Sequence, residues 1–360
     1  PAMVPEANGG QSAERNHQNR KGSEMFRKFM TAKLGMLGVV STLFAAAAPA
    51  SADIIVMGGN PEGSLFYAQA QAIASVVGKH TDLRVDVLPQ SGTVYFPMFQ
   101  TEEADIGLAS PIEAKLAVDA ESPFDAAKSV GGYDMRTVML GSPIRLSLVV
   151  RGSSDIHSLA DLKGKRVVAN YGAFAGSTIT ALAALANGGL TADDVQVVNV
   201  SSYPEGVSAV MEGRADAAVG SIGSGILQQL NASEGARILP IDPSPEAMAR
   251  AQAVGPAFVP IMVPKGPVGI DEDTYTLSYA ITIYARPGLS DDKVKTFIDA
   301  LWEHSGELAD IHPSLKTWTP DRFANTDAVI PYHPAAIEFY KAHDAWSPEL
   351  DKKQAELLLD

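Results

Sequence analysis

Residues 54–64 read IIVMGGNPEGS, an apolar run followed by a glycine-rich turn and a serine. A short apolar run that ends at turn residues is typical of a buried strand. Ser64 is a suitable N-cap for a helix, because apolar residues recur from there to Val77 near a period of 3.6. This stretch therefore predicts a strand, a turn and a helix in succession, which is the first unit of an α/β fold.

The same order of strand, turn and helix recurs along the chain. Apolar runs predict further strands at 85–88, 106–109, 146–150, 166–169, 195–200 and 215–219. Strands that alternate with helices form parallel sheets covered on both faces. A β-rich stretch at 276–285 is expected to return the chain to its first half. We therefore predict two α/β lobes, one formed by residues 53–143 plus 276–360 and the other by residues 144–275.

Residues 25–52 have the pattern of a secretory signal peptide. A basic segment precedes an apolar run at 34–48, and Ala50-Ser51-Ala52 supplies the small residues of a cleavage site. The apolar run is shorter than the roughly 20 residues that a membrane span needs. We predict cleavage after Ala52, a periplasmic location and no stable membrane insertion, the alternative being an uncleaved anchor. Residues 1–24 are expected to be a disordered or untranslated extension.

The composition excludes several classes of function. The chain has 360 residues, a formal net charge of −14, seven histidines and no cysteine. An acidic chain is a poor partner for nucleic acid. Without cysteine there is no thiol catalysis, disulfide or cysteine-based zinc site. The neighbouring histidine pairs lack the spacing that places two ligands on one helix face, so we expect no bound metal.

Motifs of cofactor-binding enzymes are missing from the sequence. The turn GGNPEG at 58–63 does not match the glycine spacing of a dinucleotide-binding loop, and Pro61 interrupts it. The sequence contains no Walker A motif and no Gly-x-Ser-x-Gly elbow. We therefore predict no cofactor, no catalytic residue and no enzymatic activity.

Three turns each bring a hydroxyl residue to the start of a predicted helix, at Ser64, at Ser91 with Thr93, and at Ser177 with Thr178. Unpaired amides at a helix start favour a carboxylate or phosphate, and glycine allows a ligand to approach the backbone. Each serine taken alone could simply be a helix cap. Because the turns recur in both lobes, we predict a shared ligand site formed by Asn60, Ser64, Tyr67, Ser91, Gly92, Thr93, Arg145, Phe174, Ser177, Thr178 and Ser221.

Two charged residues and several aromatic residues extend this hypothesis. Arg145 precedes an apolar strand where the chain should cross between lobes, and it could bind a ligand carboxylate or form a surface ion pair. Glu62 could accept a ligand amine if it faces the cleft. The cleft walls or the core are expected to contain the aromatic side chains of Phe66, Tyr67, Tyr95, Phe96, Tyr171 and Phe174.

Several segments of the chain resemble a known family. They are GGNPEGSLFY (58–67), LPQSGTVYFPMFQTEEADIG (88–107), LKGKRVVA (162–169), GAFAGST (172–178), MEGRADA (211–217), and the tail between His312-Pro313 and Phe339-Tyr340. Their order resembles the TAXI class of solute receptors, the periplasmic components of one branch of TRAP transporters. The first two turns depart from the usual glycine- and serine-rich pattern of that class, which bears on the identity of the ligand.

The resemblance implies a two-lobed α/β fold of the periplasmic-binding-protein type II kind, with parallel-rich sheets and a ligand cleft at the hinge. It implies a small-molecule solute, in the class of glutamate or 2-oxoglutarate, and a TRAP permease driven by an ion gradient. We expect a monomeric solute receptor. A periplasmic ligand sensor and an enzyme on the same fold are the competing hypotheses.

Overall fold

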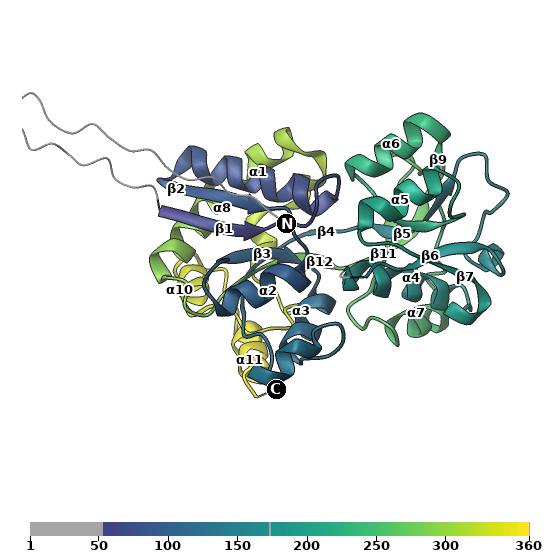
Figure 1. The fold of residues 1–360 in the computed structure, drawn as a ribbon. Coiled ribbons are helices and arrows are strands. Elements are labelled where there is room, and N and C mark those ends of the chain that lie inside the picture. The colour runs from purple at the N-terminus through teal and green to yellow at the C-terminus, as the bar shows by residue number, and fades with distance from the viewer. Residues whose placement is uncertain (1–52, 173, 360) are drawn as a thin grey trace, which may run out of the picture. The chain divides into compact units, whose positions relative to one another are not determined.

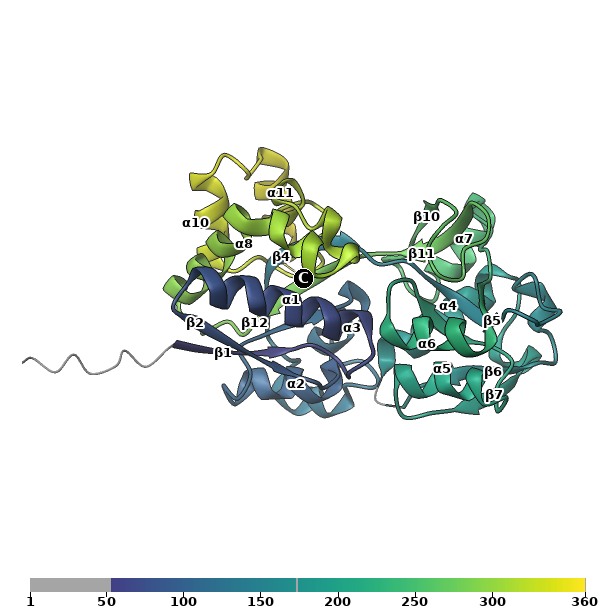
Figure 2. The ribbon, with the colours of Figure 1, turned by 90° about the horizontal axis from the view of Figure 1, so that it is seen from above.

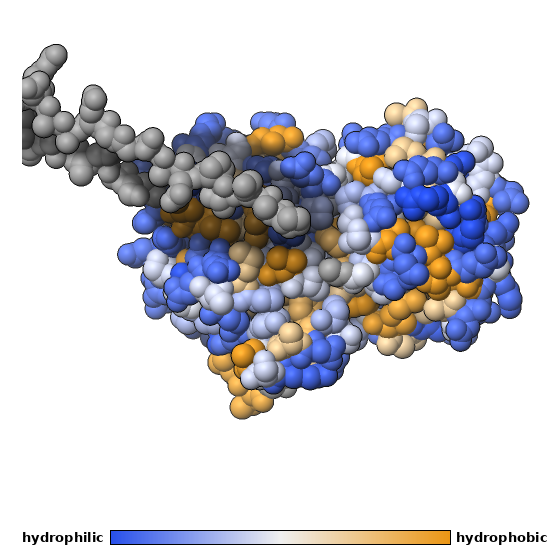
Figure 3. Space-filling view, viewed as in Figure 1, coloured by the Kyte–Doolittle hydropathy of each residue, from blue (hydrophilic) through white to orange (hydrophobic). Residues whose placement is uncertain are grey.

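The computed structural model describes residues 53–172 and 174–359. The predicted extension at 1–24 and the predicted signal peptide at 25–52 lie outside the described residues. No helix within the described ranges is long and apolar enough to span a membrane. In Figure 3 most of the visible described surface is hydrophilic, with apolar side chains in smaller patches.

The first lobe is built on a five-stranded sheet in the order β2-β1-β3-β12-β4. Strand β1 pairs in parallel with β2 and β3, while β12 runs antiparallel to β3 and β4. The strands are β1 (Asp53–Gly58), β2 (Leu83–Leu88), β3 (Ile106–Ala109), β4 (Arg136–Pro143) and β12 (Ala280–Ala285). The helices are α1 (Leu65–His80), α2 (Gly92–Gln100), α3 (Pro111–Val118), α8 (Asp291–Ile311), α9 (Pro320–Phe323), α10 (Pro334–Ala342) and α11 (Pro348–Leu357).

The second lobe holds a sheet in the order β10-β11-β5-β8, with β9 also paired to β5, and a two-stranded sheet of β6 and β7. Figures 1 and 2 show these elements gathered apart from those of the first lobe. The strands are β5 (Leu146–Arg151), β6 (Arg166–Asn170), β7 (Gln196–Asn199), β8 (Ala218–Ser221), β9 (Ala236–Ile238), β10 (Val259–Val263) and β11 (Thr274–Ser278). The helices are α4 (Ala175–Asn187), α5 (Tyr203–Met211), α6 (Gly225–Glu234) and α7 (Pro245–Gln252).

The two-lobed α/β architecture is confirmed, but the sheets are mixed rather than parallel-rich. Parallel pairs form where a helix connects two strands, as in β1 with β2 and β6 with β7. The strands next to the lobe crossings, β4, β5, β11 and β12, pair antiparallel instead. Strands β5 and β12 enter their sheets directly from the other lobe, without a helical crossover that would turn them parallel to their neighbours.

The chain crosses between the lobes at two adjacent places. Ile144 and Arg145 join β4 to β5, and Tyr279 joins β11 to β12. The two crossings are tied together because the Ile144 N–H donates to the carbonyl of Tyr279 at 2.9 Å. The predicted lobe boundary at 275/276 falls inside β11, whose end pairs with β10 and β5 of the second lobe. The sequence at 276–285 is continuously β-like and therefore does not mark where the chain changes sheets.

Tyr95 of α2 packs flat on the first sheet at two facing glycines. Gly58 and Gly107 are register partners in the β1–β3 pair. A Cβ atom on either glycine would lie 2.3 Å from the Tyr95 ring, so no larger residue fits there. The Tyr95 hydroxyl donates to the carbonyl of Leu108 at 2.7 Å. This contact fixes α2, and with it the turn at Ser91, beside the carboxyl ends of β1 and β3.

Candidate ligand-binding pocket between the lobes

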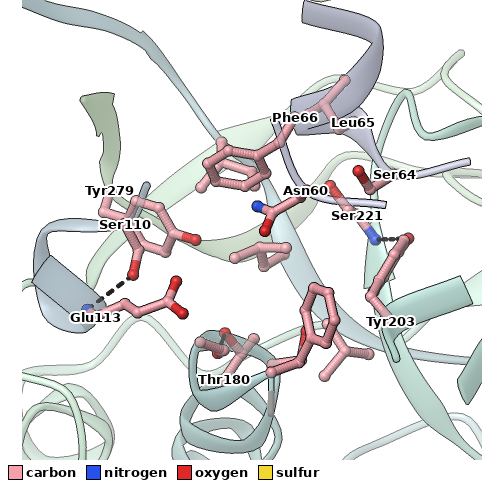
Figure 4. Close-up of a pocket in the computed structure, with 16 residues that line it drawn as sticks. Asn60, Ser64, Leu65, Phe66, Ser110, Glu113, Thr180, Tyr203, Ser221 and Tyr279 are labelled. Carbon is pink, nitrogen blue, oxygen red and sulfur yellow. Dashed lines mark hydrogen bonds between the residues drawn. The ribbon is translucent and has the colours of Figure 1, made fainter. Parts of the chain in front are cut away.

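A pocket of about 50 Å³ lies between the lobes, next to the crossings (Figure 4). That volume holds a few water-sized groups, so it suits a small molecule rather than a polymer. The first lobe contributes Asn60, Ser64, Leu65, Phe66, Ser110 and Glu113, and the crossings contribute Ile144 and Tyr279. The second lobe contributes Leu146, Phe174, Gly176, Ser177, Thr180, Tyr203, Val219 and Ser221.

Helices from both lobes begin at this pocket. Ser64 caps α1 by accepting the Tyr67 N–H at 3.2 Å, and Ser110 caps α3 by accepting the Glu113 N–H at 3.0 Å. The lining also includes the first residues of α4 and α5. The amides of a first helical turn lack intrahelical partners and carry a partial positive charge. The helix starts therefore bring amide donors to a pocket that has no basic side chain among its described lining residues.

Glu113 is the one carboxyl group among the described lining residues. Only 6% of the residue is exposed, and burial raises the pKa of its carboxyl group to about 7. A Cβ on Gly92 would lie 2.9 Å from its Oε1, and one on Gly176 would lie 3.6 Å from its Oε2. The carboxyl group makes no hydrogen bond with a described residue, and in Figure 4 it points into the pocket. Glu113 is therefore poised to bond to a ligand.

Ser221 presents a second unused polar group in the second lobe. The residue is 4% exposed, and its Oγ has no hydrogen-bond partner within the described chain. Its backbone is held by Tyr203, whose Oη accepts the Ser221 N–H at 3.0 Å and shares a hydrogen bond of 2.7 Å with Ser224. A buried hydroxyl without a partner is costly, and this one belongs to a residue that lines the pocket.

Asn60 occupies the turn after β1 in a strained conformation. Its φ of 62° lies in the left-handed region, which asparagine tolerates better than most residues. The turn is held because the Asn60 N–H donates to the carbonyl of Gln90 at 3.0 Å. Strained residues that the surrounding structure holds in place concentrate at functional sites. The carboxamide of Asn60 faces the pocket in Figure 4.

The structure brings five of the predicted site residues to the pocket, namely Asn60, Ser64, Phe174, Ser177 and Ser221. Gly92 lies directly behind Glu113. Ser91 and Thr93 do not line the pocket, and their hydroxyls share a hydrogen bond of 2.8 Å.

Three other predicted site residues lie elsewhere. Thr178 accepts the Tyr171 N–H at 3.0 Å and so holds the turn before α4. Tyr67 donates to Glu62 at 3.3 Å on the exposed side of α1, so Glu62 is already engaged. Arg145 lines a different groove.

Two further details of the sequence interpretation are corrected. Ser177 is not the N-cap of α4, because the helix begins at Ala175 and Phe174 holds the cap position. Of the aromatic residues, Phe66 and Phe174 line the pocket, whereas the core contains Tyr95, Phe96 and Tyr171. Residue type alone does not predict that these three side chains are buried in the core, because aromatic side chains suit a cleft wall and a core equally.

Sequence reasoning missed Glu113, Ser110, Thr180, Tyr203 and Tyr279. A usable signal existed for the first two, since Ser110-Pro111-Ile112-Glu113 has the Ser-x-x-Glu spacing of a helix start directly after β3. This is a fourth strand-to-helix turn of the kind that was recognised at three other places.

A cluster of metal-binding residue types lies away from the pocket, where His80 of α1 meets His304 and Glu307 of α8. The two imidazole rings are stacked 3.5 Å apart with an interplanar angle of 7°. The lone pairs of parallel stacked rings do not converge on one point, as metal coordination requires. Glu307 is also bonded to Lys79 at 2.7 Å and to His80 at 2.9 Å, so this cluster is an ion-pair contact between helices.

Two α/β lobes, joined by paired crossings and enclosing a pocket lined by helix N-termini, define a fold of the periplasmic-binding-protein type. The sequence matches the NMT1-like family over residues 57–343, and the chain belongs to this family.

Several solved structures are similar to this chain. PhnD1 from Prochlorococcus marinus in complex with methylphosphonate is 12% identical, with 82% of this chain and 100% of that chain covered and a TM-score of 0.48. A binding protein component of a phosphonate ABC transporter from Pseudomonas aeruginosa is 12% identical (85% and 97% covered, TM-score 0.47). The aliphatic sulphonate binding protein SsuA from Escherichia coli is 15% identical (81% and 88% covered, TM-score 0.43).

Proposed function

We propose that this protein is a periplasmic solute receptor that captures a small amino acid and delivers it to a TRAP-type permease. The observation that carries the proposal is a pocket lined by both lobes, in which the carboxyl group of Glu113 is buried with a raised pKa and the buried hydroxyl of Ser221 has no hydrogen-bond partner within the described chain. A ligand that bonds to both lobes stabilises the closed form, which is how such a receptor signals that it is loaded.

The chemistry of the pocket favours a ligand with both a carboxylate and an amine. The carboxylate would accept hydrogen bonds from the helix-start amides and from Ser221. The amine would pair with Glu113, the one acid among the described lining residues. Within the predicted ligand class, this arrangement favours glutamate over 2-oxoglutarate, which has no amine to offer.

The cellular context of the proposal rests on the sequence. The predicted signal peptide supports a periplasmic location, and the resemblance to TAXI receptors supports an ion-driven permease as partner. A receptor of this kind needs no cofactor and acts as a monomer.

The pH dependence of binding tests the ligand class. If an amine pairs with ionised Glu113, affinity for L-glutamate should fall about tenfold per pH unit below about pH 7, where the free carboxyl group takes up a proton. Binding of 2-oxoglutarate should weaken in the opposite direction, above about pH 7, because it needs the protonated carboxyl group as a donor. Isothermal titration calorimetry between pH 5.5 and 8.5 measures both. Absence of binding by any member of a panel of amino acids and organic acids would refute the receptor function.

Replacing Ser221 with alanine separates ligand binding from stability. The affinity for L-glutamate should fall about fivefold to tenfold, as expected for one lost hydrogen bond. The melting temperature of the ligand-free protein should not decrease, because the hydroxyl has no partner to lose within the described chain. Ser224→Ala is the matched control, since it removes the bond to Tyr203 and should lower stability more than affinity. Equal affinities of Ser221→Ala and the unmodified protein would remove Ser221 from the site.

A further inference from the structure

A second groove between the lobes, on the other side of the crossing at Ile144 and Arg145, contains Arg145. Its volume is about 310 Å³, and it is lined by Arg145, by Ile222, Gly223, Gln228, Pro267 and Val268 of the second lobe, and by His312, Pro313 and Ser314 of the first. Side chains alternate along an extended segment. Ile144 and Leu146 therefore line the ligand pocket, while Arg145 between them lines this groove on the opposite side.

Arg145 is the exception among the half-buried arginines of the described chain. Each of the others has its guanidinium bonded to a carboxylate or to backbone carbonyls, namely Arg136, Arg151, Arg166, Arg237, Arg250 and Arg286. The guanidinium of Arg145 has neither kind of partner within the described residues. Burial also lowers the pKa of Arg145. A half-buried cation without a counterion is unfavourable, which points to a partner that comes from solution.

The groove is suited to an oxyanion. No aspartate or glutamate is among its described lining residues, although the whole chain carries a net charge of −14. Arg145 offers a planar fork of donors that matches a carboxylate, phosphate or sulfate, and the Gln228 amide supplies further donors. We infer that this groove is a second binding site, distinct from the ligand pocket, for a small oxyanion held by Arg145.

An anion in this groove contacts both lobes. Gly223 of the second lobe approaches His312 and Ser314 of the first, since a Cβ on Gly223 would lie 3.8 Å from each. The Arg145 carbonyl accepts the Ile222 N–H at 3.0 Å, which ties the crossing to the same loop. The anion therefore stabilises the closed form. By linkage it also raises the affinity of the ligand pocket for its own ligand.

The test uses sodium sulfate as the probe, compared with sodium chloride at equal ionic strength. Sulfate should raise the melting temperature of the mature protein by about 3 °C and saturate in the millimolar range. In Arg145→Gln the saturable increase in melting temperature should be lost. Only the gradual increase that sulfate causes in any protein should remain. Arg322→Gln is the matched control, because Arg322 is exposed and forms no ion pair with a described residue. A saturable rise of equal size in Arg145→Gln would overturn the inference.

A second variant and a second measurement keep the test independent of folding defects and of the proposed receptor function. Val268→Glu places a carboxylate in the groove and should remain folded while losing the sulfate response.

In sulfate-free buffer, Arg145→Gln should bind L-glutamate within about threefold of the unmodified protein, and only the gain in affinity from sulfate should vanish. If L-glutamate binding is lost even without sulfate, Arg145 belongs to the ligand pocket and the separate site is refuted. If no member of the panel of amino acids and organic acids binds but the sulfate response depends on Arg145, the receptor proposal fails and the anion site stands.

Discussion

Glu113→Gln is expected to stabilise the ligand-free protein by about 3 kcal/mol at pH 8 and to reduce its affinity for L-glutamate at least 100-fold. The carboxyl group has an ordinary pKa of 4.5 and a pKa of about 7 in the folded protein, because burial disfavours its charge. The unfolded chain therefore releases this proton at a lower pH than the folded chain. Stability contributed by the protonated group is fully present below pH 4.5, declines up to about pH 7 and is constant above it.

Glutamine has no such proton, so the variant should lack this decline. Urea unfolding of both proteins from pH 4 to pH 8 would show the difference opening between about pH 4.5 and pH 7. Glu103→Gln is the matched control, since that carboxylate is exposed and makes no ion pair with a described residue.

The loss of affinity has a separate cause. Glutamine cannot provide the negative charge that pairs with a ligand amine. Removing a buried charged pair costs far more binding free energy than removing a neutral hydrogen bond. A gain of stability together with a loss of binding is the mark of a residue retained for function rather than for folding. A variant that lost stability at pH 8 would show that Glu113 instead has a structural partner in the folded protein.

Tyr95→Ala is expected to destabilise the protein by about 3–5 kcal/mol, the range for removing a buried aromatic side chain. The residue is fully buried, and its ring fills the space above Gly58 and Gly107. Tyr95→Phe should cost only about 1 kcal/mol, because it removes just the hydrogen bond to Leu108.

The reciprocal change acts through the same contact. Gly107→Ala should cost about 3 kcal/mol, because its Cβ would overlap the ring and force Tyr95 away from the sheet. In the background of Tyr95→Ala, the same glycine substitution should cost less than 1 kcal/mol. Urea unfolding of the two single variants and the double variant measures this coupling. Additive effects would show that the glycines are required for another reason.

Local structure was largely predictable from the sequence. The strand at 54–57, the helix capped by Ser64 and the strand at 106–109 follow from apolar periodicity and cap residues, which act between near neighbours in the chain. The parallel pairing of β1 with β2 and β3 follows from the helices between them. The sequence did not reveal which strands would pair antiparallel across the crossings, because that depends on segments more than 100 residues apart.

The sequence alone determined a two-lobed α/β chain with hydroxyl residues at helix starts, because caps, turns and periodicity are local properties. Only the tertiary structure decided which residues face one another. Arg145 lies in the second groove because side chains alternate along the extended crossing segment, whereas Glu113 lies at the pocket because α3 begins at the end of β3. Burial is set by the packing of distant segments, so the raised pKa of Glu113 and the unpartnered hydroxyl of Ser221 could not be read from their neighbours in sequence.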